Sequence, residues 1–303
     1  KMTDLSIIIT TFNRSKIIFD NIKKLEPLLD DCEIIVIDDA SSDDTFTSLS
    51  GFSKKYRNFK LIKNETNMGI SASWNRALNE STRNNIFILN DDVSFFYPSQ
   101  LVFVKRLLDL LDHADIVGVK LIESVEDTSN ERLWHNMQNN HSILVSIFSA
   151  FLYFLSGQIF STTSNNRGFV PYVTSMMAFR RKLGVKLLFD ELNYGDVAFK
   201  GESDFQLRAR QSNSSIYYDS TLKLLHSNEV VGGIYSQSVS SFNIHFWKLR
   251  NHVVFLRKNL PRGWFFRTVI YIIYNIILKP TKIKSTFAAI KSGILVKINV
   301  KPS

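Results

Sequence analysis

The first 120 residues alternate between short apolar runs and longer segments in which apolar residues recur at helical spacing. The short runs are rich in Ile, Val, Leu and Phe, and they predict strands at 5–10, 33–37, 59–63, 85–89 and 116–120. The longer segments predict helices at 15–29, 41–55, 70–80 and 99–113. Because the strands are apolar on both faces, the pattern predicts an α/β fold with a mostly parallel sheet and helices on both faces.

The second half of the chain has a less regular pattern. It predicts a strand at 170–180, a helix at 202–211 and one or two strands at 216–225. Residues 124–142 are polar and predict a loop, whereas 143–160 carry no charge and are borderline in length for a membrane span. We expect a buried or membrane-dipping helix there, because a span would separate the earlier from the later acidic clusters across a membrane.

Composition excludes several classes of protein. The chain has 303 residues, of which 45% are hydrophobic and 13% aromatic, and this excludes disordered and collagen-like proteins. Its single cysteine, Cys32, excludes an internal disulfide and a thiolate metal cluster, and fits a buried position in a reducing compartment. We expect no signal peptide, because the first apolar run is too short for one.

The net charge of +9 is unevenly distributed. Residues 230–303 contain twelve Lys or Arg and no acid, while the first 229 residues carry 25 bases and 28 acids. Aromatic and basic residues alternate through 242–258, and basic segments continue to residue 297. Such a tail suits an anionic membrane surface, with a helical cap that has a solvated basic face as the alternative. Nucleic acid is disfavoured as a partner, because no nucleic-acid-binding motif accompanies the charge.

Acidic side chains follow two of the predicted strands. Asp38 and Asp39 end the strand at 33–37, and Asp91 and Asp92 end the strand at 85–89. Ligands of parallel sheets bind at the carboxyl ends of the strands. Adjacent carboxylates there need a counter-charge, which a divalent cation bound to phosphate oxygens would supply; a turn or helix cap is the alternative. The glycine patterns of nicotinamide-binding and NTPase proteins do not occur in the sequence.

Four motifs follow one another in the first hundred residues. They are Ser6–Arg14, Ile35–Thr45, Asn67-Met68-Gly69-Ile70 with Asn75, and Asn90-Asp91-Asp92. In this order and spacing they resemble the family 2 glycosyltransferases, which are inverting enzymes of the GT-A fold. The resemblance continues in Phe189-Asp190-Glu191 and in Gly201–Arg208, and it covers about the first 230 residues.

The resemblance implies a site for a nucleotide-sugar donor. It implies that Asp39 accepts a hydrogen bond from a pyrimidine N–H and that Asp91 holds the ribose. Asp92 and His226 would hold a divalent cation, Mn²⁺ or Mg²⁺. Arg14 would either touch phosphate or have a surface role. The side chains expected to surround the base and the phosphates are Thr10, Phe12, Asn13, Arg14, Asn67 and Gly69.

The catalytic base is expected near the predicted helix at 202–211. Glu202 falls where the family usually has its catalytic Asp, and Asp204 falls on the second acid of that motif. An acceptor hydroxyl is a poor nucleophile and needs a general base on the face of the sugar opposite the leaving group. We expect Glu202 to be this base, with Asp204 as the alternative.

These features together predict two regions and a location. Residues 1–239 would form the GT-A catalytic domain, with a nucleotide-binding half at 1–120 and an acceptor half at 121–239. Residues 240–303 would form a basic helical tail that associates with membranes, and they resemble extensions of bacterial polysaccharide-building members, including rhamnosyltransferase-like ones. We expect transfer from a UDP- or dTDP-sugar to a glycan acceptor carried on a polyprenyl lipid. The protein would be peripheral on the inner, cytoplasmic face of the cell membrane.

Two other functions fit parts of the sequence. A sugar-nucleotide pyrophosphorylase would need a glycine-rich loop with Arg or Lys after the first strand, and residues 11–14 do not provide one. A non-catalytic, glycosyltransferase-like subunit could bind nucleotide or glycan without transferring sugar. The Glu at position 202, in place of the usual Asp, keeps this second alternative open.

Overall fold

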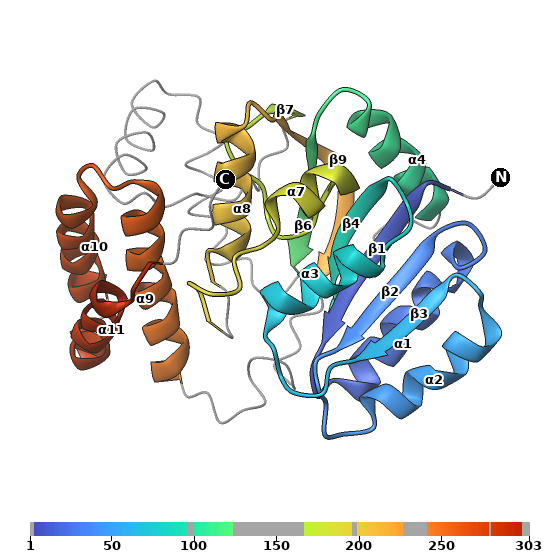
Figure 1. The fold of residues 1–303 in the computed structure, drawn as a ribbon, viewed down its shortest axis with the longest axis horizontal. Helices are drawn as coiled ribbons and strands as arrows, with labels where there is room; N and C mark the ends of the chain where they lie inside the picture. Colours follow the sequence, from blue (N-terminus) through green and yellow to red (C-terminus); the bar gives the residue numbers. More distant parts are fainter. Residues whose placement is uncertain are drawn as a thin grey trace.

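The structure is a computed structural model, and it describes residues 3–95, 100–123, 167–195, 199–226, 241–278 and 280–298. The predicted loop at 124–142 and the predicted helix at 143–160 lie outside these residues. The described part forms one large sheet, helices on both of its faces, and a group of helices formed by the basic C-terminal region (Figure 1).

Four strands pair in parallel, as their apolar runs predict. They are β1 (Leu5–Thr11), β2 (Glu33–Asp38), β3 (Phe59–Lys63) and β4 (Asn85–Asn90). Their order in the sheet is β3-β2-β1-β4. The register sets Thr11 of β1 opposite Asp38 of β2, and Thr10 opposite Asn90 of β4. The carboxyl ends of these strands therefore lie at a common edge of the sheet.

Beyond β4 the sheet contains antiparallel strands as well. The additional strands are β5 (Val93–Phe95), β6 (Ile116–Glu123), β7 (Arg167–Phe169), β8 (Met177–Arg180) and β9 (Ile216–His226). β8 is antiparallel to β4 and β6, β6 is parallel to β9, and β5 and β7 are antiparallel to β9. The single strand predicted at 170–180 is confirmed only over Met177–Arg180, because the backbone N–H and C=O of Val173 bond to the side chain of Gln206 instead of a neighbouring strand.

Helices cover both faces of the sheet, as predicted (Figure 1). They are α1 (Ser15–Leu25), α2 (Thr45–Lys55), α3 (Ile70–Glu80), α4 (Gln100–Leu111), α7 (Arg181–Leu187) and α8 (Gly201–Gln211). Successive side chains of a strand point to opposite faces. In β1, Ile7 and Ile9 therefore join a core with α1, α2 and α4, whereas Ile8 joins a second core with α3, α7 and α8.

Helices α1 and α2 are shorter than the apolar pattern predicts. Pro27 has no N–H for an α-helical hydrogen bond, so α1 ends at Leu25 and a 3₁₀ turn, η1 (Glu26–Leu28), follows it. Helix α2 begins at Thr45 and not at residue 41. The side chain of Asp38 accepts a hydrogen bond from the Ser41 N–H at 2.9 Å, and this bond holds residue 41 in a turn before the helix.

The basic C-terminal region folds into three α-helices beside α8 (Figure 1). They are α9 (Ser241–Asn259), α10 (Trp264–Leu278) and α11 (Ile283–Leu295), with a 3₁₀ turn, η3 (Pro280–Lys282), before α11. Gly293 of α11 lies so close to α9 that an added Cβ would be 2.8 Å from the carbonyl oxygen of Arg250. Within the described ranges, no helix combines the length and the apolar character that crossing a membrane requires.

Candidate functional site

The polar residues after β1, β2 and β4 meet at the carboxyl edge of the sheet. Strand β5 follows β4 closely and pairs with the end of β9, where Val93 lies opposite His226. This pairing brings His226 to the same edge. Its Nε2 lies 3.5 Å from Oδ1 of Asp92. Two side chains that are far apart in the sequence are therefore neighbours.

Arg14 reaches these acids from the residue before α1. Its Nη1 donates to Oδ1 of Asp91 and to Oδ2 of Asp92, both at 2.8 Å. Its backbone N–H donates to Oγ1 of Thr45, and only 7% of the residue is exposed. The surface role that the sequence left open for Arg14 is therefore wrong, because the start of α1 turns this side chain inward. We call Arg14, Asp91, Asp92 and His226 the edge cluster.

The two acids of the edge cluster differ in their ionisation. Burial raises the pKa of Asp91 to about 6; the charge of Arg14 acts against this rise, and the charge of Asp92 adds to it. Burial would also raise the pKa of Asp92, but hydrogen bonds from His226 and Arg14 hold it below its ordinary value. Asp92 is thus ionised across the neutral range, and Asp91 becomes so near neutral pH. A further cation at this edge would meet unbalanced negative charge.

The donor set of the edge cluster fits a metal ion that a ligand completes. In the described part of the chain, no three His, Cys, Asp or Glu side chains are arranged to hold a metal ion by themselves. Asp92 and His226 supply one carboxylate and one imidazole. Mg²⁺ keeps several waters and is usually bound by one or two carboxylates together with phosphate oxygens of a substrate. Two protein side chains are therefore enough to bind the ion if the phosphate oxygens of a bound substrate fill further coordination positions.

Asp39 lies at the same edge but is occupied by internal bonds. It is 6% exposed, and its oxygens accept from Nδ2 of Asn64 at 2.6 Å and from the N–H groups of Met68 and Gly69, both at 2.9 Å. These bonds fold the loop before α3, and Gly69, with φ +81°, takes a conformation that favours glycine. Asn67 is exposed on this loop. A contact between Asp39 and a base stays a prediction.

The loop after β1 is tied to the loop after β2. Asn13 has a positive φ of 52°, its N–H donates to Oγ of Ser41, and its Oδ1 accepts from the N–H of Ser42. Thr10 and Phe12 lie beside it and are partly buried. The structure therefore gathers the predicted residues 10–14 next to the edge cluster, with Asn13 in a bridging position between the two loops.

Glu202 lies in the first turn of α8 and is partly buried. Burial raises its pKa, while its own backbone N–H and the charge of Lys200 act in the opposite direction. Besides this backbone N–H, Oγ of Ser203 donates a long hydrogen bond to its side chain, at 3.4 Å. A carboxylate with so few strong partners remains available to take a proton from a bound molecule.

Asp204 is fully buried and its carboxylate is saturated with partners. Its Oδ1 accepts from Tyr194 at 3.0 Å, from Asn259 at 2.8 Å and from Lys258 at 2.9 Å, and its Oδ2 accepts from Arg208 at 2.8 Å. Lys258 and Asn259 could not be identified from the sequence, because both lie in the segment interpreted as a membrane tail. A spacing pattern of aromatic and basic residues does not indicate which lysine turns inward.

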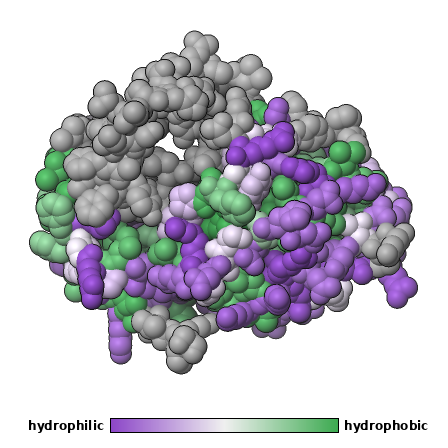
Figure 2. Space-filling view, turned by 90° about the horizontal axis from the view of Figure 1, so that it is seen from above, coloured by the Kyte–Doolittle hydropathy of each residue, from purple (hydrophilic) through white to green (hydrophobic). Residues whose placement is uncertain are grey.

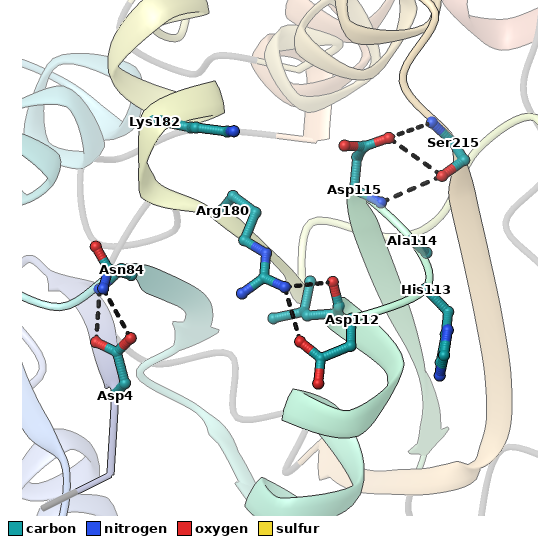
Figure 3. Close-up of a pocket in the computed structure, with 10 residues that line it drawn as sticks. Asp4, Asn84, Asp112, His113, Ala114, Asp115, Arg180, Lys182 and Ser215 are labelled. Atoms are coloured by element: carbon teal, nitrogen blue, oxygen red, sulfur yellow. Dashed lines mark hydrogen bonds and ion pairs between the residues drawn. The ribbon is translucent and has the colours of Figure 1, made fainter.

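A polar cleft of about 630 Å³ lies elsewhere, near the amino ends of β1, β4, β6 and β9 (Figure 3). Its acidic side chains and Arg180 pair with one another or with neighbouring polar groups. Asp4 accepts from Asn84 at 2.8 and 2.9 Å, and Arg180 donates to Asp112 at 2.9 Å. The cleft is therefore at the opposite end of the strands from the edge cluster and is not part of that site.

Comparison with known proteins agrees with this geometry. The family described as Glycosyl transferase family 2 matches residues 6–183, which is more than half of the chain. A curated relative from Campylobacter jejuni, the GalNAc(5)-diNAcBac-PP-undecaprenol beta-1,3-glucosyltransferase, is 27% identical over 162 residues. The match covers 53% of this chain and 51% of the relative, so the chain spans about half the length of the curated relative it matches.

Solved structures have the same fold. S. aureus TarS 1–349 in complex with UDP-GlcNAc gives a TM-score of 0.57 at 18% identity, over 96% of this chain and 81% of that one. The mannosyltransferase PcManGT from Pyrobaculum calidifontis, in complex with GDP-Man and Mn²⁺, gives 0.56 at 16% identity, over 99% and 77%. At such identities the likeness shows the fold alone, and it confirms the predicted GT-A architecture. Because the family match spans more than half of its residues, the chain belongs to glycosyl transferase family 2.

Proposed function

We propose that this chain is an inverting glycosyltransferase, which moves a sugar from a nucleoside diphosphate donor to a lipid-linked glycan in cell-surface polysaccharide synthesis. The observation that carries the proposal is the edge cluster, in which Arg14 and His226 gather around Asp91 and Asp92. Membership of the family supports the reaction class. The C. jejuni relative is named for an undecaprenol-linked substrate, which supports a polyprenyl-linked acceptor here.

On the donor side, we infer that Asp92 and His226 hold a divalent cation, Mn²⁺ or Mg²⁺, and that Asp91 holds the ribose. When bound, the cation would neutralise the negative charge that develops on the leaving diphosphate. Arg14 keeps the two carboxylates together at the end of β4. Among proteins of this fold, TarS binds UDP-GlcNAc and PcManGT binds GDP-Man, and we propose a UDP- or dTDP-sugar as the donor here. The side chains proposed to surround the base and the phosphates are Thr10, Phe12, Asn13, Asp39, Asn67 and Gly69.

On the acceptor side, we infer that Glu202 is the general base. Its carboxylate takes the proton of the acceptor hydroxyl as that oxygen attacks the anomeric carbon from the face opposite the diphosphate. The bond between the anomeric carbon and the diphosphate oxygen breaks, so the sugar is transferred with inversion and the nucleoside diphosphate leaves. Asp204 is disfavoured as the base, because Lys258 and Arg208 already neutralise its buried carboxylate.

The C-terminal helices suit a membrane surface. Phe265, Phe266, Phe287 and Leu295 of α10 and α11 are each more than half exposed. In Figure 2 apolar side chains gather at the edge of the molecule that these helices form, whereas hydrophilic ones cover more of the α/β part. No acidic residue occurs after Glu229 in the sequence. Apolar and basic side chains together favour an anionic leaflet, so we propose peripheral binding at the inner face of the cell membrane.

A thermal-shift experiment tests the donor site. UDP, dTDP and their sugars are added to the full chain with and without Mn²⁺, because a ligand that binds only the folded state stabilises it by about 2.7 kcal/mol at 100 times its Kd. We expect a shift with at least one nucleotide, and a larger shift when Mn²⁺ is present. A flat response to every nucleotide would contradict the proposal. A shift without transfer or donor hydrolysis would favour the non-catalytic subunit instead.

A further inference from the structure

Two buried carboxylates share one lysine at the junction between α8 and α9. Nζ of Lys258 lies 2.5 Å from Oδ2 of Asp190 and 2.9 Å from Oδ1 of Asp204. The side chains of all three residues are at most 12% exposed. Arg208 completes the group through its bond to Asp204. We call Asp190, Asp204, Arg208 and Lys258 the α9 cluster.

The α9 cluster joins three segments that are separate in the sequence. Arg208 also donates to the carbonyl oxygens of Leu187 and Leu188, at 2.6 and 2.7 Å. Asp190 accepts from the N–H groups of Leu192 and Asn193, both at 3.0 Å. The segment 187–193, the first turns of α8 and the last turn of α9 are therefore connected through two acids and two bases, whose charges balance.

Further bonds from α9 hold the same segment. Nδ2 of Asn251 donates to the carbonyl oxygen of Tyr194 at 2.8 Å, and Arg250 donates to that of Asn193 at 2.6 Å. The Tyr194 side chain, fully buried, packs with Val254 and Phe255 of α9. The buried face of α9 thus contacts the segment that precedes α8. Helix α9 therefore does more than contribute to the basic, exposed side of the C-terminal region.

The α9 cluster also bears on Glu202. Residues two apart on a helix do not share a face, so Asp204 turns toward α9 while Glu202 points to another side of the same turn. Fixing Asp204 from one side therefore fixes the backbone that carries Glu202. Removing Lys258 would leave two buried carboxylates with Arg208 as the one cation among their described partners, and the helix turn would have to move to let water reach them.

We propose that Lys258 is a positioning residue, which crosses from the C-terminal helices to neutralise Asp190 and Asp204 and thereby holds the first turn of α8 in place for catalysis. The inference rests on the proposed function, in which Glu202 is the base. It makes α9 a part of the catalytic unit, whereas the sequence-based boundary at residue 240 assigns it to a membrane tail.

The experiment compares Lys258→Met with Lys54→Met, in which an exposed lysine of α2 is replaced in the same way. Misplacement of a reacting group by about 1 Å can cost 10²-fold in rate. We expect kcat to fall at least about tenfold in Lys258→Met while KM for the donor changes less than about twofold. Lys54→Met should match the wild type, and Lys258→Arg, which keeps the charge, should recover part of kcat.

A charge-balanced variant separates positioning from folding. Asp190→Asn combined with Lys258→Met leaves Asp204 paired with Arg208, so the fold should recover stability while the ion pairs from Lys258 of α9 remain absent. We expect kcat of this double variant to stay low. A kcat within about twofold of the wild type, in either Lys258→Met or the double variant, would overturn the inference.

Hydrogen exchange gives a readout that does not need activity. In both variants we expect faster amide exchange at residues 201–206, with exchange in α3 unchanged. Unchanged exchange in α8 would overturn the positioning role even if the wild type showed no transfer. An inactive wild type with faster exchange in the variants would instead contradict the proposed function alone, so the two failures are distinguishable.

Discussion

The edge cluster and the α9 cluster each contain two neighbouring carboxylates, but their charges are balanced differently. In the α9 cluster a lysine and an arginine face the two acids, and a tyrosine and an asparagine add hydrogen bonds. In the edge cluster one guanidinium bridges both acids, and the other partner is an imidazole, whose charge depends on pH. The first arrangement is complete without a ligand, whereas the second gains from an added cation. Charge balance thus distinguishes a cluster that is complete from one that has room for a further cation, a difference that the acid motifs do not show.

The largest effect is expected at Glu202. Glu202→Gln removes the proposed base but keeps the shape of the side chain, and general base catalysis typically contributes about 10²–10⁴-fold. We expect transfer to fall by that factor while the donor-induced thermal shift survives. Steady-state rates and the shift are measured on the same preparation. If Glu202→Gln keeps its activity and Asp204→Asn loses it, Glu202 is not the base.

Asp204→Asn tests whether the α9 cluster stabilises the fold. Removing one partner of a buried ion pair typically costs about 3–5 kcal/mol, because the remaining charge stays buried without compensation. We expect a loss of unfolding free energy in this range in urea titrations. Transfer per folded molecule should remain at least about tenfold above that of Glu202→Gln. A variant as stable as the wild type would show that Asp204 is not held as the structure describes.

Asp92→Asn tests whether the edge cluster binds a cation. Groups that stabilise charge in a transition state typically contribute about 10²–10³-fold to the rate, so we expect the transfer rate to fall by a factor of this size. The increase of the nucleotide-induced thermal shift on adding Mn²⁺ should disappear in the variant. Chelation with EDTA should lower the transfer rate of the wild type toward that of the variant. The control is Asp30→Asn, which changes an exposed acid. An Asp92→Asn enzyme that still responds fully to Mn²⁺ would remove Asp92 from the proposed metal site.

The pH profile gives a smaller effect with a defined direction. Because burial raises the pKa of Glu202, transfer should be lost on acidification at a pH above the ordinary glutamate value of about 4.3. The pH dependence of the free energy of unfolding has the opposite direction. A carboxyl group whose pKa is raised on folding stabilises the protein below its unfolded pKa, and this contribution is lost as pH rises through the folded pKa. Glu202→Gln should therefore reduce the pH dependence of both rate and urea stability.

The sequence predicts the parallel half of the sheet better than the rest. The bounds of β3 and α3 agree with the prediction, because an apolar run and a clear helical spacing define each of them. β5 and β7 have three residues each, which is too short for an alternation to be visible. Their positions depend on pairing with β9, a contact between distant segments that local patterns do not encode.

The candidate site, too, contains some residues that the sequence predicts and others that it does not. The acids at the strand ends could be located from the sequence, because strand ends of a parallel sheet converge. The inward orientation of Arg14 could not, since it depends on the turn before α1 and on Thr45 of another loop. Lys258 could not either, because α9 is basic and apolar along its whole length. Its burial follows from two acids on other segments.

The smallest effect concerns the exposed side of the C-terminal helices. A basic side chain near an anionic leaflet contributes about 1 kcal/mol, so Lys284→Gln on α11 should weaken binding to phosphatidylglycerol-containing vesicles about fivefold. Binding to pure phosphatidylcholine vesicles should not change, and Lys54→Gln on α2 serves as the matched control. Equal losses in both variants would contradict docking through this face. Truncation at residue 240 cannot make this distinction, because it also removes Lys258 from two buried acids, whereas a substitution on the exposed face leaves the α9 cluster intact.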